Sequence, residues 1–332
     1  MEYVWLIGGF ILLIVGADVF VEGSSNIAKL LKIPSIIIGL TVVAFGTSMP
    51  EASVSINAAI AGSNSIAVSN VVGSNIFNLL VVLGASALIL PVHTNATAVK
   101  KEIPYSIILA VVLGILLCFG VSFAEVVLPE ISFFEKISGA TFTLGRIGGA
   151  VLLVLFALYM YWQIGGALKA RKSGEIEELP EEKKMAPFMA VELVIVGLVG
   201  IIYGGDLVVD NACIIAEKFG MSETFIGLSI VAIGTSLPEL VTSMVAARKG
   251  ESDLALGNVI GSNIFNIVFI LGFSAVLAPM TVDILTICDI IVLVAVSIVG
   301  WLFAKSKQIV SRLEGGIMLL MYVVYFVYIL LR

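Results

Sequence analysis

The chain has 332 residues, of which 60% are apolar and only 13% are charged, and its formal net charge is −6. Soluble domains are about half apolar and about a quarter charged, so this composition excludes a soluble globular protein and favours a membrane protein. The slight acidity and the lack of any basic stripe argue against a nucleic-acid partner.

Runs of about 20 apolar residues, each long enough to cross about 30 Å of hydrocarbon, follow one another with short gaps. Ten such runs are predicted to be transmembrane helices, which leaves no room for a separate soluble domain. The first run has no basic flank, so a cleaved signal peptide is not expected. The runs cover residues 3–21, 36–61, 66–91, 104–123, 139–164, 188–208, 224–247, 253–279, 284–304 and 313–331.

The basic residues predict the orientation of these helices, because Lys and Arg concentrate in cytoplasmic loops. With the N-terminus outside, fourteen of the 18 Lys and Arg residues fall in inward loops and three in outward segments, while Arg146 falls within a run. We therefore expect a multi-pass protein of the cell membrane whose two termini both face away from the cytoplasm.

Two motifs recur with one offset along the chain. GTSMPE at 46–51 returns as GTSLPE at 234–239, and GSNIFN at 73–78 returns unchanged at 261–266, each 188 residues later. Each half then holds five helices, and an odd number inverts the second half relative to the first. Inverted repeats are typical of secondary transporters, whose substrate site lies near the membrane midplane.

The sequence therefore predicts an all-α polytopic membrane fold of ten transmembrane helices in two inverted five-helix repeats. The first repeat spans 1–168 and the second spans 188–332, and the regions that carry the two motifs lie at 38–91 and 226–279. Residues 169–187 carry five basic and five acidic side chains, so we expect a solvated cytoplasmic linker.

The first motif should break its helix. Pro50 has no N–H to give to the carbonyl of Gly46, and its ring pushes that carbonyl aside. We expect the helix to kink or unwind just before this proline and to release backbone oxygens such as those of Ala44 and Thr47. Thr47 and Glu51 are four residues apart and so share a helix face.

The second copy and the second motif supply further oxygen atoms. Serine and asparagine in GSNIFN lie four apart on one helix face, and the same holds in its repeat. An ionisable group at membrane depth is costly, so the two buried glutamates indicate function. The candidate metal ligands are Glu51, Glu239, Thr47, Thr235, Ala44, Ala232, Ser74, Ser262, Asn78, Asn266, Ser48 and Ser236.

This set contains only oxygen donors, which suits a hard cation and not zinc or copper. Calcium takes about 6–8 oxygen ligands, and two carboxylates neutralise its charge. Two sodium ions would neutralise the same pair. A site that is filled by either occupant, and never by both, is the physical basis of an exchanger.

Other polar residues are expected to play different parts. Asn75 and Asn263 point elsewhere on their helices and should hold neighbouring helices together. Asp18 and Asp206 correspond under the same offset and are interpreted as helix-end or gate acids. His93 lies at the end of a run, where a surface role is expected.

The two motifs resemble the alpha-repeats of the calcium/cation antiporter superfamily, specifically its sodium/calcium exchanger branch and the related prokaryotic exchangers. The likeness covers essentially the whole chain, because both motifs occur in order, twice. It implies a cluster of four cation sites, and it implies that the first and sixth helices slide against the remaining bundle. Proton-coupled members typically carry a GNAxE-type sequence at the first motif, so the likeness favours sodium coupling.

One position departs from that pattern. Some members carry an aspartate where this chain has Asn266. With two buried carboxylates, a third sodium ion would leave the site with a net charge of +1, which is costly at low dielectric. The departure argues against a three-to-one stoichiometry and against potassium co-transport.

We predict a secondary antiporter that exchanges sodium for calcium, and not an enzyme, with no catalytic residues and no resident cofactor. Its expected partners are the two ions and the lipid bilayer, with no obligatory protein partner. Calcium/proton exchange through the same two glutamates is the alternative. A passive cation channel would give little reason for an inverted repeat, and an intramembrane protease would need a catalytic pair that the mid-membrane residues do not supply.

Overall fold

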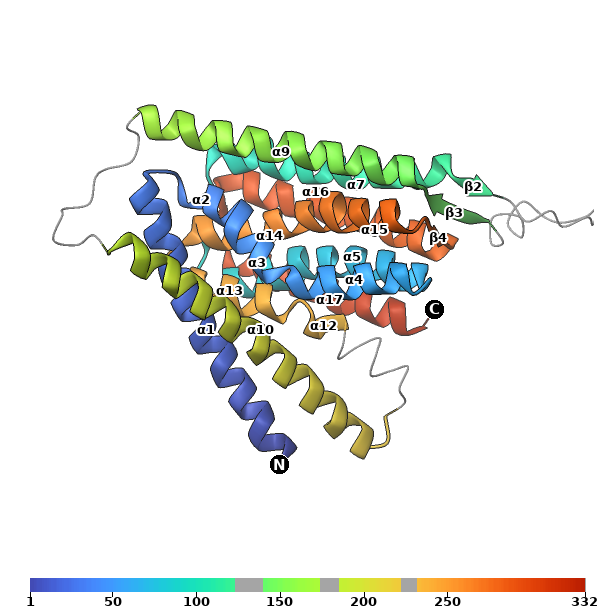
Figure 1. Cartoon of the computed structure of the whole chain (residues 1–332), viewed down its shortest axis with the longest axis horizontal. Coiled ribbons are helices and arrows are strands. Elements are labelled where there is room, and N and C mark those ends of the chain that lie inside the picture. The colour runs from blue at the N-terminus through green and yellow to red at the C-terminus, as the bar shows by residue number, and fades with distance from the viewer. Residues whose placement is uncertain (123–139, 174–184, 222–231, 332) are drawn as a thin grey trace, which may run out of the picture.

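Helices make up most of this protein (Figure 1), for which a computed structural model describes residues 1–122, 140–173, 185–221 and 232–331. Segments labelled η are π-helical turns. The elements are α1 (Glu2–Leu31), α2 (Ser35–Ile38), η1 (Gly39–Val43), α3 (Ala44–Thr47), α4 (Met49–Ile60), α5 (Asn64–Phe77), η2 (Asn78–Val82), α6 (Leu83–Ile89), β1 (Val92–His93), η3 (Ala98–Glu102), α7 (Ile103–Phe119), β2 (Val121–Ser122), β3 (Thr141–Leu144), α9 (Arg146–Ser173), α10 (Pro187–Lys218), α12 (Ala232–Gly234), α13 (Leu237–Arg248), α14 (Ser252–Phe265), η6 (Asn266–Leu271), α15 (Gly272–Leu277), β4 (Met280–Val282), α16 (Ile284–Lys307), β5 (Ile309–Val310) and α17 (Arg312–Leu331).

Eight helices in the described residues are long and apolar enough to cross a membrane. A ninth span is formed if the pair Ser35–Thr47 and Met49–Ile60, bent by 51° at their junction, crosses as one broken helix. The expected span 224–247 begins outside the described residues, and its described part comprises α12 and α13. The total of ten helices therefore stays a prediction, as do the linker at 169–187 and the start of the motif region at 226.

The predicted boundaries of the first, fifth and sixth runs differ most from the observed helices. The first and sixth runs were expected to end at 21 and 208, yet α1 continues to Leu31 and α10 to Lys218. Both helices outlast their apolar runs because the following residues keep a buried side, such as Ser24 and Ala28 in α1. Arg146 was placed within a span and is the first residue of the candidate span Arg146–Lys172, but that run was expected to begin at 139, and the residues just before Arg146 form strand β3.

The expectation of an all-α fold was also incomplete, because two small antiparallel sheets connect helix ends. Strands β2, β3 and β4 form one of them, with Phe142 opposite Val282, at one end of the bundle (Figure 1). Strands β1 and β5 form the other, with Val92 opposite Val310. Pairing satisfies the backbone groups of these short connections, which regular helix cannot cover.

The core is built around two helices that carry the same motif. The central stretch of Ser65–Ile89 is 72% buried and that of Ser252–Leu277 is 83% buried, against 17–39% in the other six long spans. Each of the two central spans passes into a π-helical segment, η2 or η6, at the last asparagine of its GSNIFN motif. Single π turns inside helices are frequently found at functional sites.

Glycines line the contact between α1 and α10, which lie side by side with their far ends projecting from the bundle (Figure 1). A Cβ atom built on Gly16 would lie 2.8 Å from main-chain atoms of Gly200 and Ile201. The two main chains therefore touch, an approach that only small residues permit in membrane helices. These close-contact glycines recur every seven residues, at Gly9, Gly16 and Gly23 in α1 and at Gly197 and Gly204 in α10.

Candidate functional site

Both GTSxPE motifs interrupt their helices, as predicted. In the first half α3 ends at Thr47 and α4 begins at Met49, with Pro50 in the first turn of α4. In the second half α12 ends at Gly234 and α13 begins at Leu237, again with proline in its first turn. Pro50 fits a first turn because the N–H that it lacks has no partner within the helix there. Each interruption places a glutamate at the start of a new helix, where the positive end of the helix dipole favours an anion.

The backbone carbonyls differ from expectation. The carbonyl of Ala44 was predicted to be released, but it accepts the backbone N–H of Ser48 at 3.1 Å. In the second half the N–H of Ser236 donates to the carbonyl of Ile233 at 3.2 Å, one residue after Ala232 at the start of α12. The helix therefore tightens around Ser236, whereas it closes an ordinary turn at Ser48.

Glu51 and Glu239 are brought together by hydrogen bonds that cross between the two halves. The hydroxyl of Ser48 donates to Oε1 of Glu239 at 2.8 Å, and the hydroxyl of Ser236 donates to Oε1 of Glu51 at 2.8 Å. Both carboxylates have no exposed surface. Each acid is thus oriented by a serine from the opposite repeat.

The second oxygen of each carboxylate makes no hydrogen bond within the described residues. Within the described part of the chain, Oε2 of Glu51 and Oε2 of Glu239 are buried and have no hydrogen-bond partner. Burying an ionised oxygen without a partner costs several kcal/mol, so a native site needs a cation or a proton there. This pair of oxygens makes Glu51 and Glu239 the candidate cation ligands of the site.

The GSNIFN motifs place further oxygens in the same buried region. The hydroxyl of Ser262 donates to Oε1 of Glu239 at 3.4 Å, whereas the hydroxyl of Ser74 has no partner among the described residues. The amide oxygens of Asn78 and Asn266 are likewise buried and without a described partner. Together with the carboxylates, these atoms belong to the all-oxygen ligand set predicted from the sequence, which stays a prediction.

The two motif threonines are buried beside these groups. The hydroxyl of Thr47 lies 3.0 Å from Oδ1 of Asn258 and 3.2 Å from the carbonyl of Val43. Thr235 is 9% exposed and lines a cavity of about 210 Å³ between α10 and the two proline-broken helices. The cavity adjoins both motifs, because Pro50 and Pro238 also line it.

Sequence reasoning did not assign a role to Asn70 and Asn258, which tie each glutamate helix to its neighbour. Asn70 donates to the hydroxyl of Ser55 at 2.9 Å, and Asn258 donates to the hydroxyl of Ser243 at 2.9 Å. The signal was present, because all four residues repeat with the 188-residue offset. These bonds hold the glutamate helices against α5 and α14.

Asp18 and Asp206 correspond in sequence but have different surroundings. Asp206 lines the 210 Å³ cavity, where Asp210 is its neighbour one turn along α10. Asp18 instead forms an ion pair with Lys249, whose Nζ lies 3.0 Å from Oδ1 of Asp18 and 3.9 Å from Oε2 of Glu22. Both aspartates lie within long helices and not at helix ends, so the helix-end interpretation was wrong.

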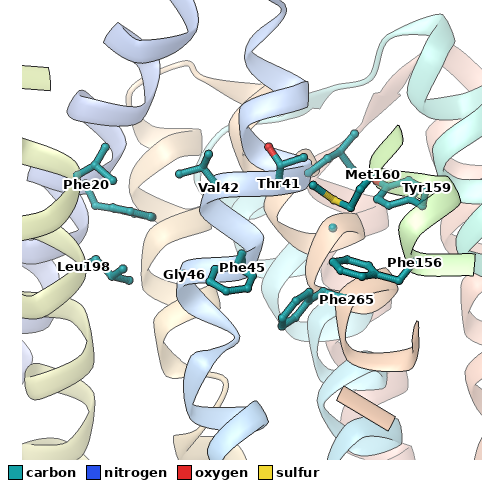
Figure 2. Close-up of a pocket in the computed structure, with 13 residues that line it drawn as sticks. Phe20, Thr41, Val42, Phe45, Gly46, Phe156, Tyr159, Met160, Leu198 and Phe265 are labelled. Carbon is teal, nitrogen blue, oxygen red and sulfur yellow. The ribbon is translucent and has the colours of Figure 1, made fainter. Parts of the chain in front are cut away.

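A separate apolar pocket of about 340 Å³ lies between the α1–α10 pair and the rest of the bundle (Figure 2). Phe20 from α1 and Leu198 from α10 line one side, and Phe45, Phe156 and Phe265 line the other. The cavity separates part of the α1–α10 pair from the core, although Leu198 still approaches the main chain of α3, where a Cβ on Gly46 would lie 3.0 Å from it.

The chain is similar to known proteins over most of its length. Residues 1–165 and 189–331 match the model of a family described as "Sodium/calcium exchanger protein". The chain is 39% identical to the putative antiporter CaxA of Alkalimonas amylolytica, over 97% of this chain and 96% of that protein. It is 32% identical to the sodium/calcium exchanger MaX1 of Methanosarcina acetivorans, over 98% of each chain.

The fold is similar to that of a solved exchanger. A structure of the sodium-calcium exchanger NCX_Mj, soaked with Na⁺ and Ca²⁺, superposes with a TM-score of 0.79 at 31% sequence identity. The match covers 97% of this chain and 96% of that one. A second structure of the same protein, soaked without Na⁺ and Ca²⁺, gives a TM-score of 0.80 over 99% of this chain.

Proposed function

Because this chain belongs to the sodium/calcium exchanger family of multi-pass membrane proteins, we propose that it is a secondary antiporter that exchanges sodium for calcium by alternating access. The observation that carries the proposal is the pair of fully buried glutamates, held by serines of opposite halves, with one unpartnered oxygen on each. One Ca²⁺ or two Na⁺ neutralises these two charges, so the two ions compete for one pocket.

The proposed ligands are the oxygens that meet around these carboxylates. Backbone carbonyls and hydroxyls complete the shell that calcium requires, and none of them brings further charge. Several of these oxygens have no hydrogen-bond partner among the described residues, so they are free to bind a cation. The set is Glu51, Glu239, Ser48, Ser236, Thr47, Thr235, Ser74, Ser262, Asn78, Asn266 and the carbonyls of Ala44 and Ala232.

For alternating access, we propose that α1 and α10 move as one unit against the remaining helices, within a fold of ten spans in two inverted repeats. The close-contact glycines of α1 and α10, here called the glycine seam, join the two helices. The 340 Å³ pocket lies between this pair and part of the core. Such a pair can shift its position without breaking its own contact. The termini are proposed to face away from the cytoplasm, as the distribution of basic residues predicts.

Calcium flux into proteoliposomes tests the function. Vesicles are loaded with sodium and diluted into sodium-free buffer containing labelled calcium, with the same pH on both sides. The proposal expects calcium uptake that stops when the sodium gradient is dissipated. If uptake follows a pH gradient and ignores sodium, the protein is a calcium/proton exchanger. If labelled calcium leaks without any acceleration by calcium on the far side, the protein is a channel.

The ion pair between Lys249 and Asp18 of α1 is expected to hold α1 in place. It should therefore favour the conformation in which the end of the protein that carries this pair is closed to solvent. Exchanging Lys249 for alanine removes its bonds to Asp18 and Glu22, and exposed pairs of this kind are worth about 0–1 kcal/mol. We therefore expect labelling of a cysteine at Ser25, buried beside this ion pair, to speed up by at most about fivefold.

The labelling is done with a thiol reagent in a background that lacks the native cysteines. Lys249→Arg retains the cation and serves as the control, with the labelling rate of the parent. Equal rates in Lys249→Ala and in the parent would show that the ion pair does not restrain α1.

A further inference from the structure

Four buried asparagines meet where the two central spans approach each other. Each GSNIFN motif contributes two of them, three residues apart, so that both lie near one face of their helix. All four are at most 1% exposed. The pairs are Asn75 and Asn78 from the first half and Asn263 and Asn266 from the second.

The first asparagine of each pair is anchored on the opposite backbone. Nδ2 of Asn75 donates to the carbonyl of Asn263 at 3.1 Å, and Nδ2 of Asn263 donates to the carbonyl of Asn75 at 3.2 Å. The nitrogen end of each side chain is therefore fixed by main chain of the other half. The Oδ1 atom of each side chain can therefore accept a hydrogen bond from another residue.

That neighbour is the proposed ligand asparagine of the opposite half. Nδ2 of Asn266 donates to Oδ1 of Asn75 at 3.0 Å, and Nδ2 of Asn78 donates to Oδ1 of Asn263 at 3.2 Å. The oxygens Oδ1 of Asn78 and Asn266 are the ends without a described partner. An amide can turn by a half rotation, and only its oxygen end binds a cation.

We propose that Asn75 and Asn263 are positioning residues, each of which holds the ligand amide of the other half with its oxygen toward the cation. The inference rests on the proposed function, because it assigns Asn78 and Asn266 as ligands. The arrangement resembles the outer hydrogen bonds that orient metal ligands in other proteins. It crosses between the repeats, so each half sets the ligand geometry of the other.

The same bond explains why an amide suits position 266. Nδ2 of Asn75 is committed to a carbonyl, so Oδ1 is the atom that Asn75 presents to residue 266. An ionised aspartate there would set two acceptor oxygens against each other at about the 3.0 Å that now separates Asn266 Nδ2 from Asn75 Oδ1. In this chain the network favours a neutral ligand at 266, and the site keeps the formal charge of its two glutamates.

Double-mutant cycles test the crossed assignment. The single variants are Asn75→Ala and Asn263→Ala, and each is combined with Asn78→Ala and with Asn266→Ala. Calcium binding to purified protein is measured by the rise in unfolding temperature with calcium concentration, which does not depend on transport. Half-saturation and maximum rate of sodium-driven calcium uptake are measured separately.

Removal of an orienting partner typically weakens metal binding by about 10–100-fold, and we expect Asn75→Ala to do the same. Asn75→Ala should add nothing to Asn266→Ala but should multiply the effect of Asn78→Ala, with the mirror pattern for Asn263→Ala. Asn57→Ala removes an exposed amide that donates to the hydroxyl of Ser53 at 3.4 Å, and this control should not change calcium affinity.

Coupling of Asn75 with Asn78 instead of Asn266 would overturn the proposal, as would a lower maximum rate with unchanged calcium affinity. If Asn75→Ala does not fold, Asn75→Ser goes through the same cycles, because serine keeps a polar group at this buried position but lacks the Oδ1 that accepts from Asn266. A crossed pattern in calcium binding without sodium-driven uptake would retain the positioning role and reject sodium coupling. Absence of calcium binding by the parent protein would reject both.

Discussion

Exchange of either Glu51 or Glu239 for glutamine is expected to abolish sodium-driven calcium uptake. Glutamine keeps the shape of the side chain and an oxygen that can accept from Ser236 or Ser48, so the change removes charge and little else. With one carboxylate missing, bound Ca²⁺ leaves a net charge of +1 in a dry pocket. Removing one partner of a buried charge pair costs about 3–5 kcal/mol. That cost corresponds to a loss of calcium affinity of more than about 100-fold.

Calcium titration of the purified variants and uptake into vesicles measure this loss. Asp18→Asn is the control, because Asp18 is exposed and pairs with Lys249 outside the pocket, so its calcium affinity should match that of the parent. The two glutamine variants should be similarly defective, since each acid is fully buried and accepts a hydrogen bond from a serine of the opposite half. Retention of calcium affinity by either variant would remove the proposed site.

Exchange of Gly16 for leucine is expected to separate α1 from α10 and to destabilise the protein. A Cβ there meets main-chain atoms of Gly200 and Ile201 at 2.8 Å, and main chain cannot turn aside as a side chain can. Overpacking of a well-packed contact lowers the free energy of unfolding by about 1–3 kcal/mol. Here α1 and α10 must also move apart along their shared contact, because the obstructing atoms belong to main chain. The unfolding temperature in detergent and the rate of calcium uptake should both fall.

Gly8→Leu is the matched control, eight residues earlier in the same helix. A Cβ on Gly8 has no atom within 4 Å among the described residues, so leucine has room and glycine's poor helix propensity is removed. Gly8→Leu should unfold at the temperature of the parent or above it. Equal unfolding temperatures for the two variants would contradict a close helix contact at Gly16.

The parts of the site that sequence predicted are those fixed by local chemistry. A proline within an apolar run must break the helix, and the break therefore appears at both Pro50 and Pro238. The 188-residue repeat then required two copies of one arrangement, and Glu51 and Glu239 are brought together as expected. The glycine seam could also have been found, because its seven-residue spacing is visible in the sequence.

Other features depend on which residues meet in three dimensions, and spacing along one helix does not reveal that. Lys249 pairs with Asp18, while its counterpart under the 188-residue offset is Ala61, so two aspartates with equivalent positions acquire different partners. The crossed bonds of Asn75 and Asn263 are likewise set by how the two halves dock. The lengths of α1 and α10 were missed because hydropathy marks where apolar sequence ends, and helices continue past that point.

The crossed serine–glutamate bonds bear on how far the two repeats can diverge. A duplicated segment is ordinarily a spare copy, free to accumulate changes while the original is retained. Here Ser48 serves Glu239 and Ser236 serves Glu51, so neither repeat holds a complete set of its own. A substitution of the serine in one repeat therefore removes a hydrogen bond from the glutamate of the other repeat. Selection on one pocket therefore acts on both segments at once, which accounts for motifs that have stayed nearly identical in a single chain.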